Sequence, residues 1–232
     1  MPLDEARSRW LPAASPEDTM HDDPPDTRRW AAWRSTERRR LVAARLAMPA
    51  GLRRRHALRI GAALDGVLGD VAGLLVAVYW PIRGEPDLRA WIDSLRARGA
   101  RCALPVVVAR NAPLAFHDWP RGARLQRGVW NIPVPVDAAP VVPQVVIAPV
   151  VGFDRDAYRL GHGGGYYDRT LASARPRPRA IGVGYAEAEL ASILPQPHDV
   201  AMDLVVTELG VAAASSHHPT NGPIFRMGSQ NP

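Results

Sequence analysis

The segment Pro143–Thr170, PQVVIAPVVGFDRDAYRLGHGGGYYDRT, joins an apolar run of strand length to a glycine cluster and then to a helical pattern. A continuous apolar run predicts a strand that is buried on both faces of a sheet. Glycine loses the most conformational entropy on folding, so the four glycines within residues 161–165 indicate a backbone shape that side chains would prevent. We therefore predict a strand, a tight glycine loop and a helix in succession.

Similar patterns fill the chain between residues 30 and 212, where helical and strand-length segments alternate. Helical patterns occupy residues 33–48, 52–68, 85–99 and 165–174, with Ser35 or Thr36 as a candidate cap of the first. Strand patterns occupy residues 71–80, 102–109, 114–119, 143–154, 179–185 and 202–208. This alternation predicts an α/β fold, a single three-layer domain with a mostly parallel sheet covered by helices on both faces. In such sheets ligands bind beyond the carboxyl ends of the strands, where the glycine loop is expected.

The two ends of the chain have a different composition. Residues 1–29 are rich in Pro, Asp, Ser and Ala without a hydrophobic period, which predicts a disordered N-terminal extension. Residues 213–232 similarly predict a disordered C-terminal tail. The sequence shows no signal-peptide pattern and no apolar run long enough to span a bilayer. Its single cysteine, Cys102, cannot form an internal disulfide, and these features together predict a cytoplasmic protein.

All 29 basic residues of the chain are arginine. The absence of lysine excludes a Schiff-base enzyme, a lysine general base and a Walker-type phosphate loop. The charge is concentrated, because residues 34–59 hold nine Arg and one Glu, a local balance of +8, against +6 for the whole chain. Such a concentration favours a polyanionic partner at one place. One hypothesis is therefore an Arg-rich nucleic-acid-binding protein, although no recognition motif accompanies the arginines.

Other familiar glycine motifs also fail to match the cluster. A dinucleotide fingerprint would need glycine where Tyr166 stands, and a calcium loop beginning at Asp154 would need other residues where Tyr158 and Arg159 stand. What fits is a loop whose consecutive backbone N–H groups converge on an oxyanion at the N-terminus of a helix.

Arg159 and Asp168 flank this loop and extend its chemistry. A guanidinium pairs well with phosphate oxygens, whereas a carboxylate beside phosphates is useful when a divalent cation screens the repulsion. The constellation thus suggests a magnesium nucleotide. Spacing alone is equally compatible with a tight strand-to-helix turn in which Asp168 stabilises the start of the helix.

Residues 152–171, GFDRDAYRLGHGGGYYDRTL, resemble the signature of the 5-formyltetrahydrofolate cyclo-ligase family, also called 5,10-methenyltetrahydrofolate synthetases. YWPIRGEPDL at residues 79–88 resembles the family's folate-side strand and turn, and residues 181–208 resemble its C-terminal end. With a basic N-terminal helix, the resemblance spans Trp33 to Leu209. It implies ATP- and magnesium-dependent cyclisation of 5-formyltetrahydrofolate to 5,10-methenyltetrahydrofolate, with release of ADP and phosphate. The implied step is phosphorylation of the formyl oxygen, which needs positioning and charge neutralisation but no protein nucleophile.

The resemblance also implies roles for individual residues. The implied ATP-binding residues are Arg34, Arg38, Arg159, Leu160, Gly161, His162, Gly163, Gly164, Gly165, Tyr166 and Tyr167. The implied substrate-binding residues are Trp80, Glu85, His162, Gly163, Gly164, Gly165 and Tyr166, and the implied magnesium ligands are Asp168 and Asp199. Arg34 stands where the family has lysine. His162 stands where the family is variable, so we expect it to line the site through its backbone.

Two alternatives to the enzyme are the nucleic-acid-binding protein and a degenerate family member that binds folate or nucleotide without turnover. The partners that the family implies are a reduced folate and ATP, with no nucleic acid and no membrane. The protein is expected to be a monomer.

Overall fold

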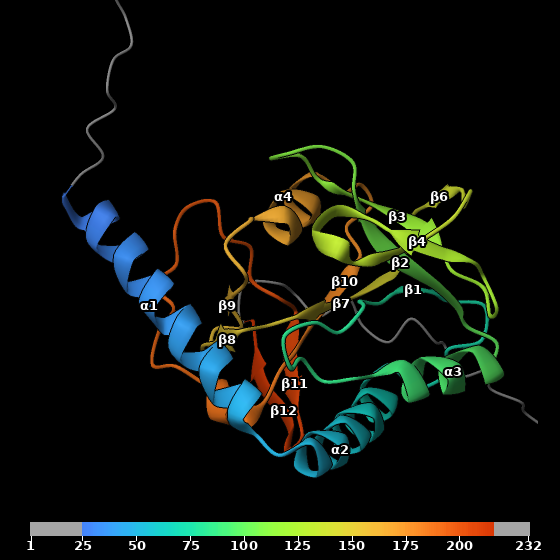
Figure 1. The fold of residues 1–232 in the computed structure, drawn as a ribbon, viewed down its shortest axis with the longest axis horizontal. Helices are drawn as coiled ribbons and strands as arrows, with labels where there is room; N and C mark the ends of the chain where they lie inside the picture. The colour runs from blue at the N-terminus through green and yellow to red at the C-terminus, as the bar shows by residue number, and fades with distance from the viewer. Residues whose placement is uncertain (1–24, 216–232) are drawn as a thin grey trace, which may run out of the picture.

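The computed structural model describes residues 25–215 and shows an α/β fold (Figure 1). Its helices are α1 (Pro25–Ala47), α2 (Ala50–Leu68), α3 (Arg89–Ala97) and α4 (Tyr166–Ser173), with 3-10 turns η1 (Val129–Asn131) and η2 (Ala186–Ala188). The strands of the main sheet are β1 (Leu75–Ala77), β2 (Arg101–Val107), β3 (Leu114–Asp118), β6 (Pro140–Val141), β7 (Val145–Pro149), β10 (Arg179–Val183), β11 (Leu204–Thr207) and β12 (Gly210–Ala214). Two small antiparallel hairpins are β4 (Leu125–Arg127) with β5 (Pro133–Pro135), and β8 (Gly152–Phe153) with β9 (Arg159–Leu160).

The main sheet has the strand order β12-β11-β10-β7-β1-β2-β3-β6. Its central strands β11, β10, β7, β1 and β2 are parallel, and antiparallel strands close both edges. The register places Val76 opposite both Cys102 and Val145, and these residues are buried. Strands buried on both faces explain the continuous apolar runs of the sequence. The predicted α/β class with a mostly parallel sheet is confirmed.

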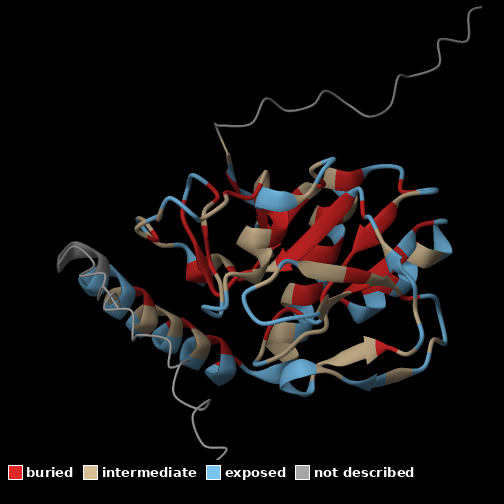
Figure 2. Ribbon diagram, turned by 90° about the horizontal axis from the view of Figure 1, so that it is seen from above, coloured by how far each residue is buried: buried red, intermediate tan, exposed pale blue. Residues whose placement is uncertain are grey.

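Helices cover both faces of the sheet (Figures 1 and 2). On one face, Ile60 and Leu64 of α2 pack with Ile92 of α3 in the largest apolar cluster. On the other face, Leu171 of α4 packs with alanine and valine side chains of β7, β10 and β11. Helix α1 lies beside the β8–β9 hairpin, where Leu41 packs against residues that follow β7 and β10. Figure 2 shows that burial is concentrated in the strands between these layers.

The structure differs from the sequence prediction at both ends of the described chain. Helix α1 begins at Pro25 and not at Trp33, so residues 25–29 are helical, and Ser35 and Thr36 lie inside the helix. Their hydroxyls accept hydrogen bonds from Arg39 instead of capping the helix. Strand β12 continues to Ala214, two residues beyond the predicted domain end. The remaining parts of the predicted disordered ends, residues 1–24 and 216–232, lie outside the described residues.

Several short elements were not predicted from the sequence. Strands β5 and β6 contain proline, which usually argues against a strand, but both pair with only one neighbour each. Helices α2 and α3 end as predicted near Gly69 and Gly99, which have φ of 65° and 87°. None of the helices within residues 25–215 is both long enough and apolar enough to span a bilayer.

Candidate functional site

A cavity of about 700 Å³ opens at the carboxyl ends of β1, β2 and β7. Tyr79 and Trp80 enter it directly after β1, Val107 ends β2, and Pro149 ends β7. Helix α1, the glycine loop between β9 and α4, and the β4–β5 hairpin complete the lining. The site therefore lies where parallel α/β sheets bind ligands, as the sequence predicted.

The cavity brings together nearly all of the residues that the sequence singled out. Those that line it are Arg34, Arg38, Trp80, Glu85, Arg159, Gly161, His162, Gly163, Gly164, Gly165, Tyr166, Tyr167, Asp168 and Asp199. Leu160 is the exception, because it is fully buried in the apolar cluster that joins α1 to the β8–β9 hairpin. Leu160 therefore supports the loop from the core and does not line the cavity.

The glycine loop has a backbone that requires glycine. Gly163 and Gly165 have φ of 98° and 61°, and Gly165 is the residue from which α4 starts. A β-carbon on Gly164 would stand 2.7 Å from the ring of Tyr166. The carbonyl of Gly161 accepts a hydrogen bond of 2.8 Å from the Nε of Arg38, which ties the loop to α1. The loop thus presents its backbone to the cavity at the N-terminus of α4.

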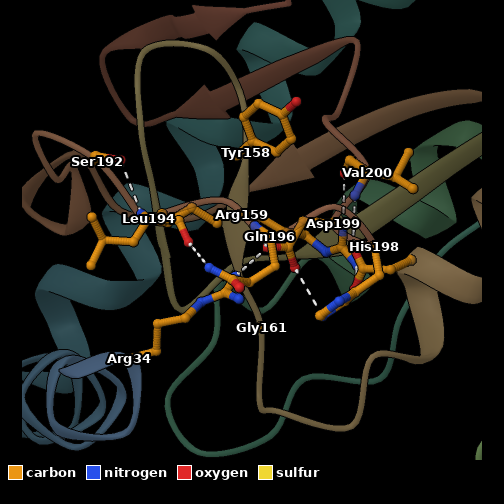
Figure 3. Close-up of polar contacts among 12 residues, drawn as sticks. Arg34, Tyr158, Arg159, Gly161, Ser192, Leu194, Gln196, His198, Asp199 and Val200 are labelled. Atoms are coloured by element: carbon orange, nitrogen blue, oxygen red, sulfur yellow. Dashed lines mark hydrogen bonds and ion pairs between the residues drawn. The ribbon is translucent and has the colours of Figure 1, made fainter. Parts of the chain in front are cut away.

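Two aspartate–arginine pairs stand beside this loop. Asp168 accepts hydrogen bonds from Arg159 at 2.9 Å and from the backbone N–H of Val200 at 3.1 Å. Asp199 accepts from Arg34 at 2.8 Å, and Figure 3 shows this arginine reaching from α1 toward the loop that carries the aspartate. These two carboxylates are 31 residues apart in the chain and line the same cavity.

The positive charge of this region exceeds the charge of the two aspartates. Arg34, Arg38 and Arg159 line the cavity with Asp168 and Asp199, three cations against two anions. Burial is the main cause that lowers the pKa of the Arg38 guanidinium, and the neighbouring Arg34 lowers it further. In addition, the Nε of Arg34 is buried without a hydrogen-bond partner. A polyanionic ligand would satisfy both features.

The donor atoms at this place fit magnesium in the presence of phosphates. Within residues 25–215, no group of three or more His, Cys, Asp or Glu side chains could hold a metal ion alone. Mg²⁺, however, is usually held by one or two carboxylates together with substrate phosphates and water. Asp168 and Asp199 supply two such carboxylates. Among the described residues, the hydrogen bonds that Asp199 accepts from Arg34 and Gln196 are both to Oδ2, and Nε2 of the exposed His198 stands 4.0 Å from Oδ1. The set therefore fits a metal that arrives with a nucleotide.

Glu85 is buried on another side of the cavity. Its Oε2 accepts from the backbone N–H of Ile82 at 2.9 Å, and its Oε1 lies 3.0 Å from Nε2 of His162. Arg45 reaches the same oxygen at 3.8 Å and donates its Nε–H to the carbonyl of Arg83. Burial lowers the pKa of the Arg45 guanidinium, although Glu85 acts in the opposite direction. The side chain of His162 thus takes part in the site, which corrects the prediction that only its backbone would.

Trp80 belongs to an aromatic group at the edge of the cavity. Its ring lies 6.0 Å from that of Trp119, and the guanidinium of Arg89 stands 5.4 Å from its centre. The partly exposed indole offers an apolar face to a ring-shaped ligand.

The sequence reasoning missed one whole side of the cavity. Its residues are Pro105, Val106, Val107, Leu114, Val129, Trp130, Ile132 and Val134. Trp130 has φ of 54°, and its ring meets that of Tyr166 edge-on at 5.5 Å. An exposed aromatic beside glycine and two prolines, GVWNIPVP at residues 128–135, is the signal that could have identified it. The place of Arg45 beside Glu85 was also not predicted, because in the sequence Arg45 cannot be distinguished from the exposed arginines of the same helix.

Comparison with known proteins identifies the family of the chain. The model of the 5-formyltetrahydrofolate cyclo-ligase family matches residues 31–208. A 5-formyltetrahydrofolate cyclo-ligase of Mycolicibacterium smegmatis is 33% identical over 184 residues, which cover 75% of this chain and 93% of that protein. The NMR structure of the Aquifex aeolicus 5,10-methenyltetrahydrofolate synthetase has a TM-score of 0.68 at 26% identity, covering 82% of this chain and 99% of that one. The Mycoplasma pneumoniae synthetase shares the fold, with a TM-score of 0.63 at 23% identity over 75% and 98% of the two chains. The chain therefore belongs to the 5-formyltetrahydrofolate cyclo-ligase family.

Proposed function

We propose that the protein catalyses the ATP- and magnesium-dependent cyclisation of 5-formyltetrahydrofolate to 5,10-methenyltetrahydrofolate, releasing ADP and phosphate. One observation carries the proposal: a single cavity combines a glycine loop, three arginines and two aspartates with the buried Glu85 and a wall of apolar side chains. The first group has the chemistry to bind a triphosphate. The second has the chemistry to bind a ring system with N–H donors.

In the proposed reaction both substrates lie in this cavity. The formyl oxygen attacks the γ-phosphorus of ATP, and ADP leaves. The second folate nitrogen then attacks the activated formyl carbon and loses its proton, and phosphate leaves as the ring closes. Phosphoryl transfer of this kind depends on alignment and on neutralising charge, so Arg34, Arg38 and Arg159 act by binding phosphate oxygens.

Magnesium, held by Asp168 and Asp199 with phosphate oxygens, would supply further charge neutralisation at the transferred phosphoryl group. Without a nucleotide, each of these carboxylates pairs with an arginine. Binding of the metal and of the phosphates would therefore exchange partners: the carboxylates turn to the metal, and the arginines turn to the phosphates. The cytoplasmic location and the monomeric state remain predictions from the sequence.

The nucleic-acid hypothesis has less support from the arrangement of the arginines. Arg40 pairs with Glu37, and Arg45 is buried. Arg53 donates to the carbonyl of Met48, between α1 and α2, and to carbonyls at the end of α1. Much of the charge of residues 34–59 is therefore engaged within the protein or turned toward the cavity.

The test is incubation of the pure protein with 5-formyltetrahydrofolate and ATP, with and without magnesium, while the near-ultraviolet absorbance of the methenyl product is followed. The proposal expects product only when ATP and magnesium are both present. Product formation without ATP would overturn the role of the nucleotide. Folate binding without any product would instead support the degenerate family member.

A further inference from the structure

His162 is the one residue of the glycine loop whose side chain contacts Glu85 in the described structure. Its Nε2 lies 3.0 Å from Oε1 of Glu85 and 3.4 Å from the guanidinium of Arg45. The shorter distance favours the tautomer in which Nε2–H donates to the carboxylate. A side chain of the proposed phosphate-binding loop is thus hydrogen-bonded to the carboxylate that we propose binds the folate.

This contact covers Glu85. The side chain of Glu85 is only 2% exposed, and each of its oxygens already has a partner. A ligand that is to reach Oε1 must therefore displace a neighbour. Arg45 is held in place, because its side chain is 4% exposed and its Nε donates to the carbonyl of Arg83. His162 is 32% exposed and stands between two glycines, so it is the neighbour that can move.

The position of His162 depends in turn on a residue of the phosphate side. The carbonyl of Gly161, directly before His162, accepts the 2.8 Å hydrogen bond from Arg38. Arg38 lines the cavity and is one of the three cations available to a polyanion. When its guanidinium turns to a phosphate, the carbonyl of Gly161 loses this donor. A chain of contacts therefore runs from Arg38 through the loop to Glu85.

We propose that His162 caps Glu85 in the nucleotide-free enzyme and that nucleotide binding to the loop withdraws it, so that ATP promotes binding of the folate. This inference rests on the proposed function and adds a preferred order of binding, in which ATP binds before the folate. His162 acts as a positioning residue, because it controls access to Glu85 and takes no part in phosphoryl transfer. A hydrogen bond of this kind contributes about 1 kcal/mol, which corresponds to a change of about fivefold in affinity.

The experiment measures the dissociation constant of 5-formyltetrahydrofolate by calorimetry, with and without magnesium and a non-hydrolysable ATP analogue. For the unmodified protein we expect folate to bind about fivefold more tightly when the analogue is present. For His162→Ala we expect the tight affinity in both conditions, since no cap remains. His162→Gln, whose amide can still donate to Glu85, should restore the dependence on the analogue.

His117→Ala is the matched control, because His117 lies on β3 away from the cavity lining. It should keep the dependence of the unmodified protein. The inference is overturned if His162→Ala retains the full effect of the analogue, if it binds folate no better than the unmodified protein without the analogue, or if His162→Gln behaves like His162→Ala. In each of these cases folate still binds, so the result contradicts this inference and not the proposed function. If no variant binds folate, the proposed function fails first, and this inference fails with it.

Discussion

The two walls of the cavity differ in chemistry and in how the chain builds them. The polar wall combines α1, the glycine loop and the loop around Asp199, and it carries three arginines and two aspartates. The apolar wall consists of the end of β2, the start of β3 and the β4–β5 hairpin, with Trp130 at its rim. Glu85, which follows β1, contacts His162 of the polar wall within the same cavity. A charged triphosphate and a flat ring system can thus be held side by side, each by the wall whose chemistry suits it.

The largest effect is expected from Asp168→Asn, which removes a charge from the polar wall. The amide oxygen can keep only one of the two hydrogen bonds, from Arg159 or from Val200, but the side chain keeps its size, so the fold should persist. Loss of the proposed metal ligand should lower kcat/KM for ATP by about 100-fold or more. Steady-state kinetics measure this change, and thermal unfolding shows whether the fold is intact. Full activity of a folded Asp168→Asn variant would mean that the assigned metal site is wrong.

A smaller effect, on the stability of the fold, is expected where Arg45 contacts Glu85. Arg45→Met leaves the buried Glu85 without its cationic neighbour and the carbonyl of Arg83 without a donor. The free energy of unfolding should fall by about 3 kcal/mol, as measured by urea denaturation. Arg54→Met, at an exposed position of α2, should change it by less than about 0.5 kcal/mol. Equal effects of the two substitutions would show that Arg45 is not part of a buried pair.

The apolar wall is tested by Trp130→Ala. This change removes the edge-on contact with Tyr166 and an aromatic surface of the proposed folate site. We expect the KM for the folate to rise about fivefold and the KM for ATP to stay constant. Trp30→Ala, on α1 and outside the cavity lining, should leave both values unchanged. A rise in the KM for ATP alone would reverse the assignment of the two walls.

The smallest effect concerns the strand that supports the apolar wall. Burial raises the pKa of the Cys102 thiol in β2 to about 11. Because the raised value lies far above neutral pH, only about one molecule in a thousand carries a thiolate at roughly pH 8. Iodoacetamide should therefore modify the native protein much more slowly than the urea-unfolded protein. Rapid modification of the native protein would show that β2 opens readily.

The polar wall could largely be predicted from the sequence, because its groups are close together in the chain. The glycine loop, Arg159 and Asp168 fall within ten residues, and the resemblance to the family adds Asp199. The α/β class was equally accessible, since strands buried on both faces leave continuous apolar runs. The exception is Leu160, which the motif predicted to bind ATP and which is buried in the core. A contiguous motif does not distinguish a residue that lines a cavity from one that supports it.

The apolar wall could not be predicted, because distant and irregular segments form it. Strands β4 and β5 have three residues each, and the two prolines in β5 conceal its strand character. The role of Arg45 could not be predicted for another reason. In the sequence it resembles the exposed Arg39 and Arg40, and only the fold brings the carbonyl of Arg83 and the carboxylate of Glu85 to it. Burial of a charge depends on partners that are remote in the chain.

The most direct test of the account follows the formyl oxygen itself. The protein would be incubated with ATP, magnesium and 5-formyltetrahydrofolate labelled with ¹⁸O in the formyl group, and the inorganic phosphate released would be examined by mass spectrometry. If both substrates react in one cavity by phosphorylation of the formyl oxygen, the label will appear in the phosphate. If the label is released in water and the phosphate stays unlabelled, the formyl oxygen is not phosphorylated and the proposed reaction is wrong.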